Sequence, residues 1–239
     1  MSRSWTALGL LLVAASCSKP SGESPNSGTS ASTTVAEPPA PGGEVVRPTS
    51  TELAPFAVGQ WSKYRTTMDD GTTAEITYKI VGEERGAHWI EIVRGAAEAG
   101  TVMQLLVKLT SRSDPNGIEI KAARIRMPNS EMRELGEDKL GPTADGYKKA
   151  LADVFVPSLT GSPQEDVTVP AATFRGAYKR QQKTDVAEGS PDQVVWLHPA
   201  VPISGVVKSE EVGKPGKTEL LTWGASGAKS EMQRGRPTP

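Results

Sequence analysis

The 239-residue sequence is poor in the side chains that hold metals and form cross-links: it has one cysteine and two histidines. A single thiol cannot form an internal disulfide, so the fold has to rest on its apolar core. His88 and His198 have no acidic or histidine neighbour at ligand spacing, and no glycine loop has the spacing that binds phosphate. We therefore predict neither a metal site nor a cofactor.

An excess of charge of either sign is also missing. The 27 Lys and Arg residues oppose 28 Asp and Glu residues, which gives a formal net charge of -1. Without a basic excess we expect no nucleic-acid partner, and without a charged block we expect no electrostatic docking on acidic lipid. The apolar run from Trp5 to Ala15 is too short to span a bilayer, because a spanning helix needs about 20 residues.

Catalytic motifs are incomplete. The sequence Gly224–Ala228 lacks the second glycine of a nucleophile elbow. Ser226 and Lys229 fit the S-x-x-K pattern, but the companion S-D-N and K-T-G motifs are absent. The carboxylate pairs Glu83–Glu84 and Glu210–Glu211 lie on or beside predicted strands among polar residues, which favours solvated faces over a glycosidase pair. We do not expect an enzyme.

The first 16 residues are typical of a bacterial signal peptide. Arg3 supplies the positive start, the apolar run follows, and the sequence Val13–Cys17 (VAASC) places small residues before the cysteine. This pattern resembles the processing box of bacterial lipoproteins, in which the cysteine is diacylated and becomes the new N-terminus. The resemblance implies a lipid anchor on Cys17, with an ordinary secretory signal and an incidental cysteine as the alternative.

A lipid anchor would place the protein in the cell envelope. Each buried methylene contributes about 0.8 kcal/mol, so two or three acyl chains attach a protein stably without a spanning helix. Ser18 stands where the enterobacterial inner-membrane retention signal has aspartate. The outer membrane is therefore favoured over the inner membrane.

Residues 17–55 form a predicted tether. From Ser18 to Pro55 the chain is rich in Ser, Thr, Pro, Gly and Ala and has no aromatic residue. Such a segment cannot bury enough apolar surface to offset the entropy lost on ordering. We expect a lipidated cysteine on a disordered linker, one folded domain over residues 56–234, and a frayed tail at residues 235–239.

Within residues 56–234, short runs of β-branched and aromatic residues alternate with turn signals, which is typical of antiparallel strands. The sequences Asp69–Gly71 and Asp114–Gly117 predict tight turns, because glycine tolerates the positive φ that hairpins need. We predict ten strands, at residues 58–68, 72–81, 87–94, 102–110, 118–127, 167–169, 173–182, 193–198, 205–212 and 218–224.

The phase of the apolar residues predicts how the sheet bends. In the strand at 118–127 the phase changes between Ala122 and Ala123, which predicts a β-bulge. Residues 145–156 have helical spacing, and the sheet's concave side is the available partner for their apolar stripe. The predicted fold is mainly β (α+β): a curved antiparallel sheet, half-barrel-like, wrapped around one or two helices. The stripe consists of Tyr147, Leu151, Val154 and Phe155.

The C-terminal part resembles the half-barrel superfamily of lipoprotein carriers and receptors of the bacterial envelope. The sequence Val169–Phe174 (VPAATF) is similar to the P-A-G-T-F entry to a strand in such proteins, with Ala172 in the glycine position. The sequences Val201–Ser209 and Trp223–Ser230 are similar to the two strands that end these domains. The resemblance implies a fold more than a task.

Two functions remain open from the sequence. The first is a binding module that holds a lipid, an acyl chain or a lipoprotein tail on its concave face. The second is a structural or protein-interaction module whose helix fills the concavity, so that a cavity would favour the first and a filled core the second. Four tryptophans lie in predicted strands, where each ring could either pack in the core or line a site for an apolar ligand: Trp61, Trp89, Trp196 and Trp223. The candidate apolar binding residues share one face of a strand: Met103, Leu105, Val107 and Leu109.

Overall fold

A single curved sheet dominates the computed structural model, which describes residues 44–95, 100–114, 116–128, 130–136, 140, 148, 151–182 and 192–232. Of the described residues, 54% lie in strands and 4% are helical, and they form one open sheet and one short helix. The predicted fold class is therefore confirmed: a mainly β protein whose sheet curves around a helix.

Twelve strands lie along the described residues, and residues 151–155 are helical. The strands are β1 (Val45–Val46), β2 (Trp61–Thr67), β3 (Thr73–Glu84), β4 (Ala87–Arg94), β5 (Thr101–Leu109), β6 (Ile118–Arg126), β7 (Arg133–Gly136), β8 (Gln164–Val169), β9 (Ala172–Gln182), β10 (Gln193–Leu197), β11 (Val206–Glu211) and β12 (Lys217–Gly224).

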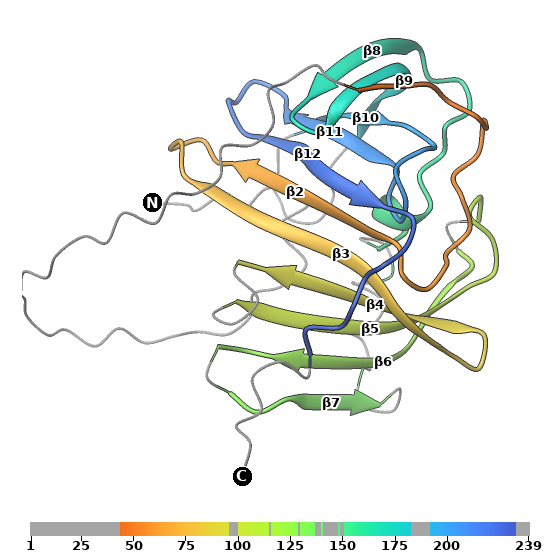
Figure 1. Ribbon diagram of the computed structural model, residues 1–239, viewed down its shortest axis with the longest axis vertical. Helices are drawn as coiled ribbons and strands as arrows, with labels where there is room; N and C mark the ends of the chain where they lie inside the picture. Colours follow the sequence, from red (N-terminus) through yellow and green to blue (C-terminus); the bar gives the residue numbers. More distant parts are fainter. Residues whose placement is uncertain are drawn as a thin grey trace, which may run out of the picture.

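The sheet consists of two wings that meet at its centre (Figure 1). Its strand order is β1-β9-β10-β11-β12-β2-β3-β4-β5-β6-β7, and β8 also pairs with β9. The wing from β2 to β7 is an antiparallel meander, and β12 joins it antiparallel to β2. The two-residue β1 is parallel to β9, and the other pairs are antiparallel.

Local turn chemistry explains the hairpins. In the β2–β3 turn the Met68 amide donates to the Thr72 carbonyl at 2.8 Å, and Gly71 adopts a φ of +80°. In the β5–β6 turn the Gly117 amide donates to the Asp114 carbonyl at 3.1 Å. The ten predicted strands correspond to β2–β6 and β8–β12, whereas the short β1 and the charged β7 were not predicted.

The predicted bulge lies in β6, one residue before the expected point. Leu106 pairs with Ala122 and Val107 pairs with Ile120, which leaves Lys121 as the extra residue. The bulge reverses the parity of the strand. As a result Ala122 packs against Trp89 on the outer face, while the next residue packs on the main core.

The main core lies between the inner face of the sheet and the helical segment. Phe155 is fully buried, and its ring meets the edges of Tyr78 at 6.4 Å and Phe56 at 5.8 Å. Leu151 and Val154 belong to the same cluster, as their spacing predicted. Tyr147 lies outside the described residues. The helical stripe therefore packs on the concave side of the sheet.

Residues 44–55, which we assigned to the tether from composition, are part of the folded structure. Val45 and Val46 pair with Thr173 and Phe174 of β9. Leu53 is 8% exposed and belongs to the main core. A few apolar side chains suffice here because β9 offers free backbone groups for pairing. The folded domain thus begins by residue 44 instead of residue 56, and residues 1–43 lie outside the described part.

Gly205 fixes where this N-terminal segment docks, and its replacement by alanine should destabilise the domain. Gly205 has a φ of +72°, and an added Cβ would lie 2.5 Å from Cδ2 of Leu53. We expect a loss of about 2–4 kcal/mol in unfolding free energy, from backbone strain plus overpacking. Gly213 is the matched control, because its φ is +77° with open space around it. Urea unfolding that gives equal losses for both alanine variants would contradict the Leu53 contact.

Candidate functional site

The candidate apolar binding residues face the interior of the domain. Met103, Leu105 and Val107 are 4%, 2% and 0% exposed. Leu109, at the end of β5, is half-buried and packs against the same cluster. That cluster also contains Leu151, Val154 and Phe155 of the helical segment. These side chains therefore lie in the core of the domain.

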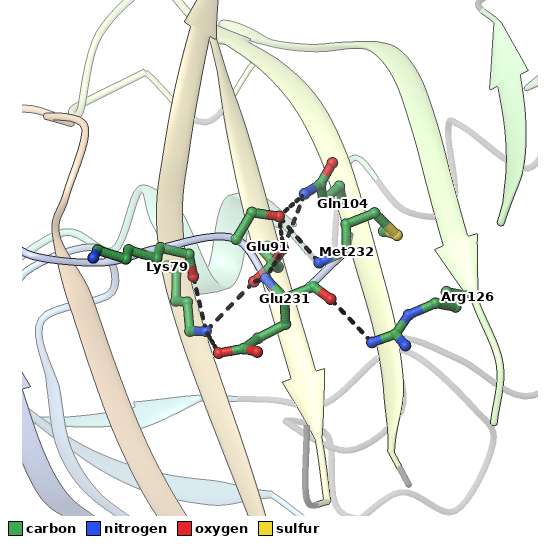
Figure 2. Close-up of polar contacts among 8 residues, drawn as sticks. Lys79, Glu91, Gln104, Arg126, Glu231 and Met232 are labelled. Atoms are coloured by element: carbon green, nitrogen blue, oxygen red, sulfur yellow. Dashed lines mark hydrogen bonds and ion pairs between the residues drawn. The ribbon is translucent and has the colours of Figure 1, made fainter. Parts of the chain in front are cut away.

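The outer face of the same strands carries a buried polar cluster (Figure 2). Its centre is Glu91 of β4, which lies between the core residues Ile90 and Ile92 and is fully buried. The Glu91 carboxylate accepts hydrogen bonds from Gln104 Nε2 at 2.9 Å and Ser230 Oγ at 2.7 Å. Three or more donors can satisfy a buried carboxylate that would otherwise be costly.

The C-terminal segment supplies the remaining donors to Glu91. The Glu231 amide donates to both carboxylate oxygens, at 2.9 and 3.1 Å. Lys79 of β3 places its Nζ 3.5 Å from Glu91 and 2.9 Å from the Glu231 carboxylate, and it also donates to the Lys229 carbonyl. Arg126 of β6 donates to the Glu231 carbonyl at 3.0 Å. Glu91 therefore holds a segment distant in sequence against the sheet.

We call residues 226–232 the C-terminal strap. After β12 the chain passes over β3, β4 and β5 toward β6 (Figure 1). The strap begins where Trp61 Nε1 donates to the Ser226 carbonyl at 3.2 Å and the Ala228 amide donates to Gly59. It ends at Met232, which is 6% exposed and packs with Val93 and Val102. The strap thus closes a second, small core on the outer face.

Lys79 is the cation that links Glu91 to the strap. Its Nζ contacts three oxygen atoms, and its side chain is 12% exposed. A hollow of about 220 Å³ lies beside it, lined by Trp61, Lys79, Gly227, Ala228, Lys229 and Glu231. In the described ranges, no three His, Cys, Asp or Glu side chains gather as metal ligands.

The two histidines lie at separate places. His88 is 3.9 Å from Glu83 and meets the Phe56 ring edge-on at 5.8 Å. His198 is fully buried beside Phe174, and its Nδ1 accepts a hydrogen bond from the Ala200 amide. Burial lowers the pKa of His198, because the protonated imidazole would lose its hydration.

The carboxylate pairs have structural partners. Glu84 accepts a hydrogen bond from Trp89 Nε1 at 3.3 Å. Glu210 pairs with Lys208 at 2.6 Å, and the 7%-exposed Glu211 lies 3.8 Å from Lys214.

The four tryptophans divide between the faces. Trp196 is 6% exposed, belongs to the main core and donates its Nε1 proton to Glu165 at 2.5 Å. Trp89 is 8% exposed in a small outer cluster and lies under the Arg124 guanidinium, 4.0 Å from the ring centroid. Trp223 packs on the main core, and Trp61 contacts the strap. Three of the rings therefore act in packing, and Trp61 also lines the hollow beside Lys79.

Comparisons with known proteins give little guidance. No protein-family model matches the chain, and no curated protein matches it. A solved structure from Bacteroides fragilis, described as an exported protein with a YmcC-like fold, shares 12% identity and covers 72% of this chain and 99% of its own, with a TM-score of 0.28. A score this low supports no inference about the present chain. In the described part no helix has the length and apolarity to cross a membrane.

Proposed function

We propose that this protein is a non-catalytic lipoprotein of the cell envelope whose β domain acts as a protein-interaction module. The protein-interaction role rests on the burial of Met103, Leu105 and Val107 in one core with the helical segment. An apolar carrier needs an open cavity of about 300–1,000 Å³. A domain whose concave face is filled has only its outer face, edges and loops to offer.

The β7 edge is the best candidate for a contact surface. Met127, which follows β6, is 45% exposed, Met132 is 47% exposed and Leu135 of β7 is 40% exposed. Among the described strands β7 pairs only with β6, so within the described part its other edge has no strand partner. Exposed apolar side chains beside a free strand edge are typical of surfaces that pair with another chain.

Lipid carriage remains the second candidate from the sequence. It rests on the resemblance of the sequence Val169–Phe174 and the two final strands to half-barrel lipoprotein carriers. For it to hold, the segment at residues 151–155 would have to leave the concave face and expose the residues that it covers.

The anchor is the part of the proposal that rests on sequence alone. The export signal ends at Cys17, the only cysteine, and Cys17 is the predicted site of diacylation. The lipid would hold the domain at the membrane, with the outer membrane favoured because Ser18 follows the cysteine. The chain between the anchor and residue 44 would set the reach of the domain from the membrane.

Labelling with radioactive palmitate tests the anchor. The wild-type protein should incorporate the label and sediment with the membrane fraction, because two or three acyl chains bind stably. The Cys17→Ser variant should be unlabelled and either soluble or unprocessed. Ser18→Ala is the matched control and should remain labelled. Equal labelling of the wild type and Cys17→Ser would rule out lipidation at this residue.

A further inference from the structure

Arg112, in the β5–β6 turn, is a half-buried cation whose Nε and Nη1 are covered, and no described carboxylate pairs with it. Its Nη2 donates to the Ile203 carbonyl at 2.7 Å, and its guanidinium carbon lies 4.5 Å from the centroid of the Phe56 ring. Its Nε and Nη1 are buried and have no hydrogen-bond partner. A guanidinium carries five N–H donors, and leaving several of them unsatisfied away from water is costly.

Among the residues that the structure describes, no acidic side chain balances the charge of Arg112. Burial alone lowers its pKa, to about 10, which still leaves it charged at neutral pH. The described groups that contact it are the Phe56 ring and the Ile203 carbonyl, and His88 also contacts Phe56 and lies 3.9 Å from Glu83. By contrast, Arg124 on the outer face has Glu134 at 2.9 Å.

The turn that contains Ile203, whose carbonyl accepts the hydrogen bond from Arg112, has a strained backbone. Ile203 is fully buried with a φ of +68°, a conformation that a β-branched residue rarely adopts. Ser204 follows and is fixed by hydrogen bonds to Tyr64 Oη at 3.0 Å and to the Val206 amide at 3.2 Å. Strained backbone that is held in place by its surroundings is concentrated at binding sites.

We propose that Arg112 is the recognition residue of an oxyanion site, which takes a carboxylate or phosphate group between the β5–β6 turn and the turn at residues 198–205. An oxyanion would accept charge-assisted hydrogen bonds from Nε and Nη1, which are the strong kind and are strengthened further in a site screened from water. Phe56 forms one wall of the site. The proposal does not depend on the lipid anchor or on the β7 edge.

The burial of the two nitrogens sets how the anion enters. An anion resting on the surface could not reach atoms that water barely touches. It has to part the two turns, so binding should perturb the backbone of Ile203 and Ser204 as well as the Arg112 side chain. Changes at all three residues together would distinguish binding in this site from weak screening of surface charges.

NMR titration of the purified signal-less domain, residues 18–239, tests the site. Sodium acetate and sodium phosphate, added separately at constant ionic strength against sodium chloride, should give saturable shifts of the Arg112 Nε–H signal and of the Ile203 and Ser204 amides. Saturation with acetate alone would assign the site to carboxylates, and saturation with phosphate alone would assign it to phosphates. Linear shifts with both anions, equal to those with chloride, would overturn the proposal.

Two substitutions separate recognition from general screening. Arg112→Gln should lose the saturable shifts of Ile203 and Ser204, because it removes the cation while keeping a polar side chain. Arg124→Gln is the matched control and should retain them, since Arg124 lies on the outer face with its own carboxylate. Saturable shifts that persist in a folded Arg112→Gln variant would also overturn the assignment. The wild-type titration decides the question even if that variant does not fold.

Discussion

Replacing Glu91 by alanine should lower the free energy of unfolding by about 3–5 kcal/mol, because it breaks a buried charged network. The fully buried carboxylate accepts from Gln104, Ser230 and the Glu231 amide, and it also faces Lys79. Its removal takes the acceptor away from the Ser230 hydroxyl and the Glu231 amide, while water has little access to replace it. Urea unfolding at neutral pH measures the loss.

The same substitution should free the C-terminal strap. Trypsin cuts after lysine, and the Lys229 carbonyl is bound by Lys79 in the wild type. Limited digestion with mass spectrometry should therefore show cleavage after Lys229 much earlier in Glu91→Ala than in the wild type.

Glu75→Ala is the control, since Glu75 is an exposed outer-face carboxylate that pairs with Lys63 at 2.7 Å. It should cost less than about 1 kcal/mol. Equal stability of the two variants would show that the strap is not fastened through Glu91.

Replacing Leu105 by aspartate should prevent folding of the domain. Leu105 is 2% exposed in the main core, and an unpaired carboxylate there costs several kcal/mol, a large share of the stability of a domain. Circular dichroism should show loss of the strand signal and of a cooperative melt. Leu105→Met nearly conserves volume and should cost less than about 1.5 kcal/mol.

Lys108→Asp controls for charge on the same strand. Lys108 is exposed, so its replacement should change stability by about 0.5 kcal/mol or less. The folded wild type should show no saturable binding of a fluorescent fatty acid, because Leu105 and its neighbours already contact protein. A Leu105→Asp variant that folds normally, together with probe binding by the wild type, would restore the open-groove hypothesis.

Most of the sheet could be predicted from the sequence because its signals are local. Alternation at residues 103–109 identifies both a strand and its buried face, and β4 begins and ends where it was predicted. The glycine turn after β2 sets a hairpin without help from distant residues. The helical stripe ending at Phe155 likewise carries its own period.

The missed features depend on contacts between distant residues. Glu91 reads as an ordinary solvent-facing position of an alternating strand, and only the return of the strap, 140 residues later, buries it. β1 consists of two valines, which form a strand only because they pair with β9. Arg112 lies between two serines, so the sequence indicates an ordinary loop residue. Its partner, the Ile203 carbonyl, is 91 residues away in the chain. The strand period alone identifies the inner face at residues 103–109. What covers that face depends on where the helical segment packs, which the strand sequence does not show.

The junction of β12 with β2 has a consequence for folding during synthesis. Thr66 and Thr218, whose hydroxyls lie 3.0 Å apart across this junction, are 152 residues apart in the chain. As the chain is synthesised, the meander from β2 to β6 can assemble early, but β2 keeps a bare edge until β12 has been made. That interval exposes the nascent protein to intermolecular strand pairing. Chaperones that shield strand edges would therefore protect this domain before β12 is in place.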